Sequence, residues 1–150
     1  MIDLVNHEAR HLALLHRHMI KQLEHELAPL GLGPGRYLYL FSLYIRDGRK
    51  QQELADLVGV DKAAATRALS RLEDNGYIRR QKDERDGRAI RVYLTPMGRK
   101  LRPRLEAAAI AAVESMTRTL EAGERAELRR LLAKMALPVV LQISQPCSGD

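Results

Sequence analysis

The residues best suited to chemistry in this 150-residue chain are lysines and arginines that gather in one stretch. Residues 61–104 hold 13 Lys and Arg against 6 Asp and Glu, a net charge of +7, whereas all other residues together carry −1. A localised basic patch attracts a polyanion, because contact with phosphates releases condensed counterions. A merely solvated surface would intersperse both signs. The charge pattern therefore favours binding to double-stranded DNA.

A second candidate is the segment His7-Glu8-Ala9-Arg10-His11, which has the spacing of a zinc-hydrolase motif. Histidines at i and i+4 share a helix face and can bind one zinc ion. The extended motif requires glycine where Leu14 stands, and little chain is left for a cleft, so we expect no enzyme, catalytic residue, cofactor or resident metal. A metal- or pH-responsive role stays open, because all five histidines lie near the start of the chain: His7, His11, His16, His18 and His25.

Composition predicts a soluble cytoplasmic protein. A hydrophobic content of 45% is too high for a disordered chain, and no apolar run is long enough for a leader or a membrane span. The single cysteine, Cys147, excludes an internal disulfide. Because Cys147 lies in a Pro- and Ser-containing tail, we interpret it as an incidental thiol rather than an oxidant sensor.

The basic stretch begins in a predicted helix-turn-helix. The turn Gly59-Val60-Asp61 separates a helix over 51–58 from a second helix over 62–75. Asp61 is a good N-cap for the second helix, and Asn75-Gly76 is a typical left-handed stop. Helical spacing directs one face of this helix to the core (Ala65, Ala68, Leu69, Leu72) and the opposite face to solvent (Ala63, Arg67, Ser70, Asp74).

A charged hairpin follows. One strand begins at Ile78, and a second, over 89–94, alternates with Ile90, Val92 and Leu94 on one face. Asp86-Gly87 between the strands suits the positive φ of a tight hairpin turn. A helix-turn-helix followed by such a hairpin is a winged helix-turn-helix.

Longer helices are predicted on both sides of this lobe. Apolar residues recur every three to four positions over 2–27, and further helices are expected over 36–46, 95–120 and 124–137, the last ending before Pro138. The helix over 36–46 is expected to turn one group of side chains inward: Leu38, Phe41, Tyr44 and Ile45.

The long helices have more apolar edge than one small lobe can cover, which favours a two-fold dimer. The expected fold is mainly α with a small β-hairpin wing, dimerised through its N- and C-terminal helices. Three regions are predicted: an N-terminal dimerisation helix and loop (1–35), a winged helix-turn-helix lobe (36–98) and C-terminal dimerisation helices (99–150). Such a dimer places two reading helices about one DNA turn (~34 Å) apart, so the operator should be pseudo-palindromic.

Between residues 50 and 100 the chain resembles the MarR family of bacterial and archaeal transcription regulators. The resemblance is carried by Gln51-x-x-Leu54-Ala55, Val60-Asp61-Lys62, Thr66-Arg67, Leu69, Leu72-Glu73, Asn75-Gly76, Asp83-x-Arg85-Asp86-x-Arg88 and Leu94-Thr95-x-x-Gly98. It implies a homodimer, usually a repressor, that many members release from DNA on binding a small aromatic or phenolic effector. The expected partners are double-stranded DNA, a second copy of the chain and such an effector, with no membrane.

The resemblance and the physics agree on the wing. The arginine that ends the charged run, Arg88, is expected to enter a narrow, electronegative minor groove, with Arg85 close to it. Asp83 and Asp86 would then act as ion-pair partners that hold the shape of the wing.

On the reading helix, Thr66 and Arg67 match family positions that approach DNA, and Arg67 can pair with a guanine edge or a phosphate. At the start of this helix, Ala63-Ala64-Ala65 offer methyl groups where family members often have hydroxyls, so fewer hydrogen bonds to bases are expected. Recognition of DNA shape by the wing is therefore expected to contribute more to specificity. The predicted helix contacts are Lys62, Ala63, Ala64, Thr66, Arg67, Ser70 and Arg71. Lys50 stands where a Ser or Thr cap would suit helix 51–58, so we expect either a weaker helix start or a lysine that faces a phosphate.

An effector pocket, implied by the resemblance alone, would lie where the helices over 2–27, 36–46 and 95–120 meet. The candidate lining residues are His11, His18, Arg36, Tyr37 and Tyr39.

Overall fold

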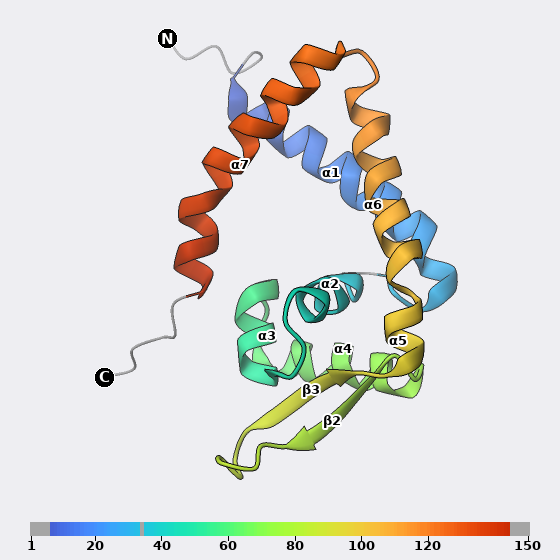
Figure 1. Ribbon diagram of the computed structural model, residues 1–150, viewed down its shortest axis with the longest axis vertical. Coiled ribbons are helices and arrows are strands. Elements are labelled where there is room, and N and C mark those ends of the chain that lie inside the picture. Colours follow the sequence, from blue (N-terminus) through green and yellow to red (C-terminus); the bar gives the residue numbers. More distant parts are fainter. Residues whose placement is uncertain (1–6, 34, 145–150) are drawn as a thin grey trace.

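The computed structural model describes residues 7–33 and 35–144, without the side chains of 139–144. A three-stranded antiparallel sheet has the strand order β1-β3-β2, and Figure 1 shows the β2–β3 hairpin projecting from one end of an otherwise helical molecule. The longer elements are α1 (Glu8–Leu27), α2 (Tyr37–Ile45), α3 (Gln51–Val58), α4 (Lys62–Asp74), α6 (Arg102–Thr117) and α7 (Ala122–Ser144). The shorter ones are the 3-10 turn η1 (Ala28–Leu30), β1 (Arg49–Lys50), β2 (Ile78–Lys82), β3 (Ile90–Leu94) and α5 (Pro96–Lys100).

The predicted helix-turn-helix is confirmed as α3 and α4. Gly59, at φ 76°, ends α3 in the left-handed region that glycine adopts without strain. The Asp61 carboxylate then accepts the Ala64 N–H at 2.7 Å and caps α4, as expected. The inner face of α4 is buried at Ala65, Leu69 and Leu72, so the predicted orientation of this helix is also confirmed.

The sheet differs from the prediction in two ways. A third strand, β1, pairs with β3 through Arg49↔Val92 and Lys50↔Arg91 and anchors the hairpin to the start of α3. The tip is also no tight turn: β2 and β3 pair as far as Lys82↔Ile90, and residues 83–89 form a longer loop in which Gly87 does not have a positive φ. The positive φ predicted for Asp86-Gly87 is therefore wrong, because the Asp83 carboxylate organises the loop instead.

Of the residues predicted on the inward face of α2, Leu38, Phe41 and Tyr44 are partly buried against the core, but Ile45 was predicted wrongly. The buried residues are Tyr37, Tyr39, Leu40 and Leu43, whereas Ile45 is 82% exposed. Helix α2 is apolar almost all round, so its sequence carries little information about which face points inward.

The predicted helix over 95–120 is broken in the structure. Thr95 caps α5 and Pro96 opens it, as expected, but the helix is interrupted at Leu101 before α6 begins. Pro103 explains the break, because its ring nitrogen cannot donate to the preceding turn. The opposite error occurs in α7, which was expected to end before Pro138 but continues through this proline to Ser144.

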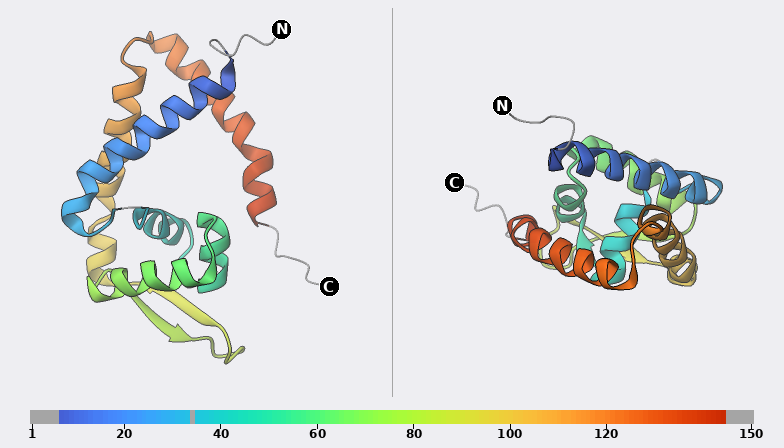
Figure 2. Two further views of the ribbon diagram at one scale, coloured as in Figure 1. Left: turned by 180° about the vertical axis from the view of Figure 1, so that it is seen from behind. Right: turned by 90° about the horizontal axis from the view of Figure 1, so that it is seen from above.

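The terminal helices form an open frame on one side of the lobe. Helices α6 and α7 descend from a common turn like an inverted V, and α1 contacts α6 (Figures 1 and 2). Seen from above, α1 and α7 run along opposite sides of this frame (Figure 2). Large apolar side chains of all three helices stay uncovered: Leu12, Leu14, Leu15, Ile110, Val113, Leu131, Leu132, Met135 and Leu137 are 41–59% exposed. Ile2 and Val5, also expected in the first helix, lie outside the described residues.

The Tyr44 side chain connects α2 to α5. Its hydroxyl donates to the Gly98 carbonyl at 2.7 Å, and burial raises the pKa of Tyr44 to about 12. Gly98 is required at this crossing, because a Cβ there would overlap the carbonyl oxygen of Tyr77. Helix α2 is thus tied to α5 by a contact that no local pattern in the sequence indicated.

Candidate nucleic-acid interface

The outer face of α4 presents cations and methyl groups to solvent. Lys62, Ala63, Arg67 and Arg71 are exposed, and Ala64 is half-buried. The three cations have no side-chain partner among the described residues. Because lone cations at a surface remain available to an incoming anion, this face suits phosphate contacts.

Two hydroxyls predicted to contact DNA also make hydrogen bonds within the lobe. The Thr66 hydroxyl donates to the Lys62 carbonyl at 2.8 Å and accepts from the Gln51 side-chain amide at 2.8 Å. The Ser70 hydroxyl accepts from the Arg80 guanidinium at 3.1 Å. Both groups tie α4 to neighbouring elements, so in this structure they hold the helix rather than face outward unpaired.

The main contact at the far end of α4 was missed by the sequence reasoning. Arg80, on β2, donates from its backbone N–H and its guanidinium to both carboxylate oxygens of Glu73, at 2.7–2.9 Å. Burial alone would raise the pKa of Glu73, but these hydrogen bonds outweigh it and hold the pKa below its ordinary value. In the sequence, the signal for this ion pair was that Arg79-Arg80 follow Glu73 at the start of a predicted strand. Two adjacent arginines suit a phosphate contact equally well, so the sequence did not favour the pair with Glu73.

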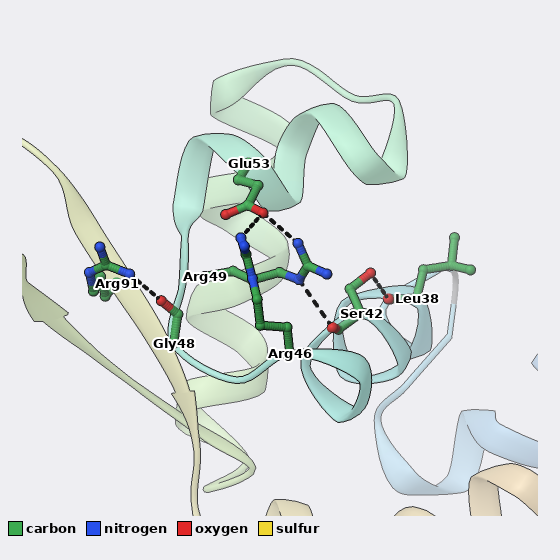
Figure 3. A network of polar contacts seen from close by, with 7 residues as sticks. All are labelled: Leu38, Ser42, Arg46, Gly48, Arg49, Glu53 and Arg91. Carbon is green, nitrogen blue, oxygen red and sulfur yellow. Dashed lines mark hydrogen bonds and ion pairs between the residues drawn. The ribbon is translucent and has the colours of Figure 1, made fainter. Parts of the chain in front are cut away.

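A second network of polar contacts holds the segment between α2 and α3, just before the helix-turn-helix. The Arg49 guanidinium donates to the Ser42 carbonyl at 3.2 Å and pairs with Glu53, which also binds Arg46 (Figure 3). The Glu53 carboxylate on α3 therefore connects β1 and the end of α2, the elements that precede α3 in the chain.

The hairpin tip is built on the buried carboxylate of Asp83. One of its oxygens accepts the backbone N–H groups of Arg85 and Asp86 at 2.8 and 3.0 Å, and the other pairs with Arg91. The two backbone hydrogen bonds, together with Arg91, lower the pKa of Asp83 from 3.8 to about 2. The Asp86 carboxylate accepts the Arg88 N–H at 3.2 Å and lies 3.6 Å from the Lys50 ammonium.

The tip arginines themselves are unpaired. The side chains of Arg85 and Arg88 are exposed and have no partner within the described part of the chain. The tip therefore combines a rigid, hydrogen-bonded backbone with two free guanidinium groups. Lys50 is the N-cap residue of α3 and makes no side-chain cap hydrogen bond, as expected where Ser or Thr is absent.

A cavity of about 350 Å³ separates the hairpin tip from the helix-turn-helix. Its walls include Lys50 and Gln51 at the start of α3, Lys62 on α4, and Asp86 and Arg88 on the tip. The side-chain amide oxygen of Gln51 is buried and has no hydrogen-bond partner within the described residues. The base of the hairpin thus contacts α4 through Arg80, whereas the hairpin tip is separated from α4 by this gap.

The predicted effector residues lie in different surroundings. His11 is exposed on α1, and His18 meets the Ser115 hydroxyl of α6 at 3.1 Å. Tyr37 and Tyr39 are core residues whose pKa values are raised by burial, and the Tyr37 hydroxyl has no partner within the described residues. Arg36 donates to the Gly31 carbonyl at 2.8 Å.

A pocket of about 250 Å³ does lie where α2 meets α5 and α6, but other residues line it: Leu43, Tyr44, Asp47, Leu94, Arg99 and Arg102. Its charges are internally matched, because Asp47 pairs with Arg99 at 2.6 Å and Arg102 lies over the Tyr44 ring and pairs with Glu106.

The described histidines do not gather. His7 caps α1 by accepting the Ala9 N–H, and among residues 7–33 and 35–144 no three His, Cys, Asp or Glu side chains are grouped to hold a metal ion. Cys147 lies outside the described residues. Within the described part of the chain, no helix is both long enough and apolar enough to cross a membrane.

Comparison with known proteins gives one consistent result. Residues 32–90 match the model of the MarR family. The chain is 34% identical over 109 residues to the HTH-type transcriptional repressor Rv2887 of Mycobacterium tuberculosis, covering 73% of this chain and 78% of that protein. A second relative, the uncharacterized HTH-type transcriptional regulator YybA of Bacillus subtilis, is 36% identical over 80 residues, a match that spans 53% of each chain.

The fold comparison agrees. The crystal structure of a MarR transcriptional regulator from Methanosarcina mazei superposes with a TM-score of 0.82 at 32% identity, covering 90% of this chain and 96% of that chain. These relatives are named as transcriptional regulators rather than enzymes, so nothing supports the zinc-hydrolase alternative. The chain therefore belongs to the MarR family of transcriptional regulators.

Proposed function

We propose that the protein is a cytoplasmic repressor that binds a pseudo-palindromic DNA operator as a homodimer. The observation that carries this proposal is a contrast among its arginines. Those inside the lobe are paired with carboxylates, whereas Lys62, Arg67 and Arg71 on α4 and Arg85 and Arg88 on the hairpin tip have no side-chain partner in the described chain. Names of relatives that include the word repressor support the direction of regulation.

Each free group has a distinct role in this proposal. Arg67, at the centre of the outer face of α4, pairs with a guanine edge or a phosphate in the major groove, and Arg71 contacts a phosphate. Ala63 and Ala64 offer methyl groups to thymine. Arg88 and Arg85 enter the adjacent minor groove, whose negative potential is strongest where it is narrow.

A second copy of the chain completes the proposed DNA-binding surface. The uncovered apolar side chains of α1, α6 and α7 are the surface that a two-fold partner would bury, at about 25 cal/mol per Å² of apolar area. The two copies of α4 then face successive major grooves, about 34 Å apart. This spacing is the reason for a pseudo-palindromic operator.

A binding titration tests the proposal. Duplexes of about 30 base pairs, long enough for two half-sites one turn apart, are selected from a random library by the purified protein. Fluorescence anisotropy then gives the Kd of the selected duplex between 50 and 300 mM salt. We expect a steep loss of affinity with salt, because several phosphates are neutralised, and a stoichiometry of two chains per duplex. Failure to enrich any duplex, or binding of one chain per duplex, would overturn the proposal.

We further propose that a small aromatic or phenolic effector releases the DNA. Two features support a site near α2: the orphan hydroxyl of Tyr37, and the cavity beside Tyr44 where α2, α5 and α6 meet. A thermal-shift screen of aromatic acids, followed by anisotropy with the selected duplex, tests this. A compound that raises the Tm and weakens DNA binding is expected. Ligands that raise the Tm without changing DNA affinity would contradict release by an effector.

A further inference from the structure

We propose that Arg91 is a positioning residue for DNA binding: its guanidinium ties the tip carboxylate of Asp83 to the Gly48 carbonyl and so sets the direction in which Arg85 and Arg88 point. This inference rests on the proposed function, because it concerns how the hairpin tip is presented to a duplex. Arg91 is the second residue of β3, just after the tip loop, and is not among the predicted DNA contacts.

The hairpin needs such a tie because apolar packing holds only its base. Ile78, Val92 and Leu94 are buried, but Ile90, one pleat nearer the tip, is already 40% exposed. Beyond it the basic cavity separates the tip from α3 and α4. A two-stranded ribbon without a packed face is weakly held in direction, so polar contacts must fix its angle.

Arg91 supplies these contacts with two different nitrogens. Its Nε pairs with the Asp83 carboxylate at the start of the tip loop. Its Nη1 donates to the Gly48 carbonyl, just before β1, at 2.7 Å (Figure 3). Strand β1 leads directly into α3, so one side chain connects the tip loop to the base of the helix-turn-helix.

The Arg91–Asp83 contact acts on Arg85 and Arg88 through the backbone of the tip loop. The Asp83 carboxylate that Arg91 holds also accepts the N–H groups of Arg85 and Asp86, which orients the loop that carries Arg85 and Arg88. Within the described part of the chain, the other side-chain link from the tip to β1 is the longer Lys50–Asp86 contact at 3.6 Å, between two half-exposed side chains. An ion pair of that kind contributes little, so the Arg91 fork is the stronger restraint.

A double-mutant cycle tests the positioning role. Anisotropy titrations with the selected duplex compare Arg91→Met in the wild-type background and in an Arg85→Ala/Arg88→Ala background. We expect roughly a tenfold loss of affinity in the wild-type background and less than about a twofold loss when the tip arginines are absent, because Arg91 acts through them. Equal losses in the two backgrounds would overturn the inference, since they would mean direct contact with DNA or general damage to the lobe.

Two further variants separate geometry from charge and from folding. Arg91→Lys keeps the charge but cannot fork between two acceptors, so we expect it to stay weak; wild-type affinity would overturn the inference. Arg130→Met, which removes a carboxylate-paired arginine from α7, is the matched control and should bind as wild type. The Tm of each variant reports folding, and if Arg91→Met does not fold, the cycle is run with Arg91→Lys. Should the wild type itself select no duplex, the proposed function fails; should it bind while Arg91→Met binds equally well, only the positioning role fails.

Discussion

The central lobe and the terminal helices leave opposite kinds of groups uncovered. In the lobe, residues such as Leu54, Leu69 and Val92 are fully buried, and several exposed cations of α4 and the hairpin tip have no side-chain partner within the described residues. On α1, α6 and α7 the large apolar side chains are the exposed ones, and several surface charges pair within the helices, as Arg130 does with Glu127.

This difference indicates what each region binds. An unpaired cation at a surface gains most from a polyanion, and an uncovered apolar stripe gains most from another apolar stripe. A region that satisfied all of its own groups would need no partner. The predictions below test the two regions separately, from the largest expected effect to the smallest.

The largest effect is expected from a substitution that creates a cavity in the core of the lobe. Leu69→Ala removes a fully buried side chain between α4 and the rest of the core and should lower the free energy of unfolding by about 2–5 kcal/mol. Chemical denaturation followed by circular dichroism measures it. Leu12→Ala, at a 46% exposed position of α1, is the matched control and should cost much less in unfolding at equal protein concentration. Equal costs would remove the distinction between the two regions.

A charge placed on the apolar stripe should separate the protomers. Leu132→Glu on α7 would force a carboxylate into the proposed interface, and we expect the dimer dissociation constant to rise by roughly 100-fold or more. Sedimentation equilibrium measures the change. Val60→Glu, the same kind of change at an exposed residue of the lobe, should leave the dimer intact. A dimer that survives Leu132→Glu would place the interface elsewhere.

Removing a tip cation should weaken DNA binding without changing assembly. Arg88→Ala should cost about 1–3 kcal/mol in binding and make affinity less sensitive to salt, because one fewer charge meets the duplex. Anisotropy at several salt concentrations gives both quantities. The control, Arg129→Ala, removes an exposed arginine of α7 and should leave the Kd within about twofold. Unchanged affinity for Arg88→Ala would exclude the wing from DNA binding.

The smallest effect concerns pH. The pKa of Asp83 is lowered from 3.8 to about 2 in the folded chain, so its stabilising contribution is complete above about pH 4 and is lost as the pH falls toward 2. We expect wild type and Asp83→Asn to differ in Tm at pH 6 and to converge as the pH approaches 2. A difference in Tm that stays constant over this range would mean that the Asp83 charge does not hold the loop.

Patterns in the sequence were sufficient for the helix-turn-helix. The period of α4, its Asp61 cap and the stops at Gly59 and Gly76 are local signals, and the structure confirms all of them. The face of α2 was not predictable, because a helix that is apolar almost all round has no preferred side. The helix break at Leu101 had a local signal in the sequence, Pro103. We gave more weight to the regular spacing of apolar residues and therefore predicted one continuous helix.

The contacts that set the interface were the least predictable part. Arg79, Arg80, Arg85, Arg88 and Arg91 are the same residue type within a short stretch, and any of them suits a phosphate. The structure separates them, because Arg80 pairs with Glu73 and Arg91 with Asp83, whereas Arg85 and Arg88 have no side-chain partner within the described residues. A cation's role depends on which carboxylate lies nearby in space, and sequence distance does not give that.

By itself, the sequence determined that this chain forms a winged helix-turn-helix with a basic reading surface, because helix period, caps and local charge are properties of neighbouring residues. Only the tertiary structure decided which arginines hold the lobe together and which stay free. That choice depends on contacts such as Arg91 to Gly48, between residues 43 positions apart, and these exist only once β1, β3 and α3 have packed together.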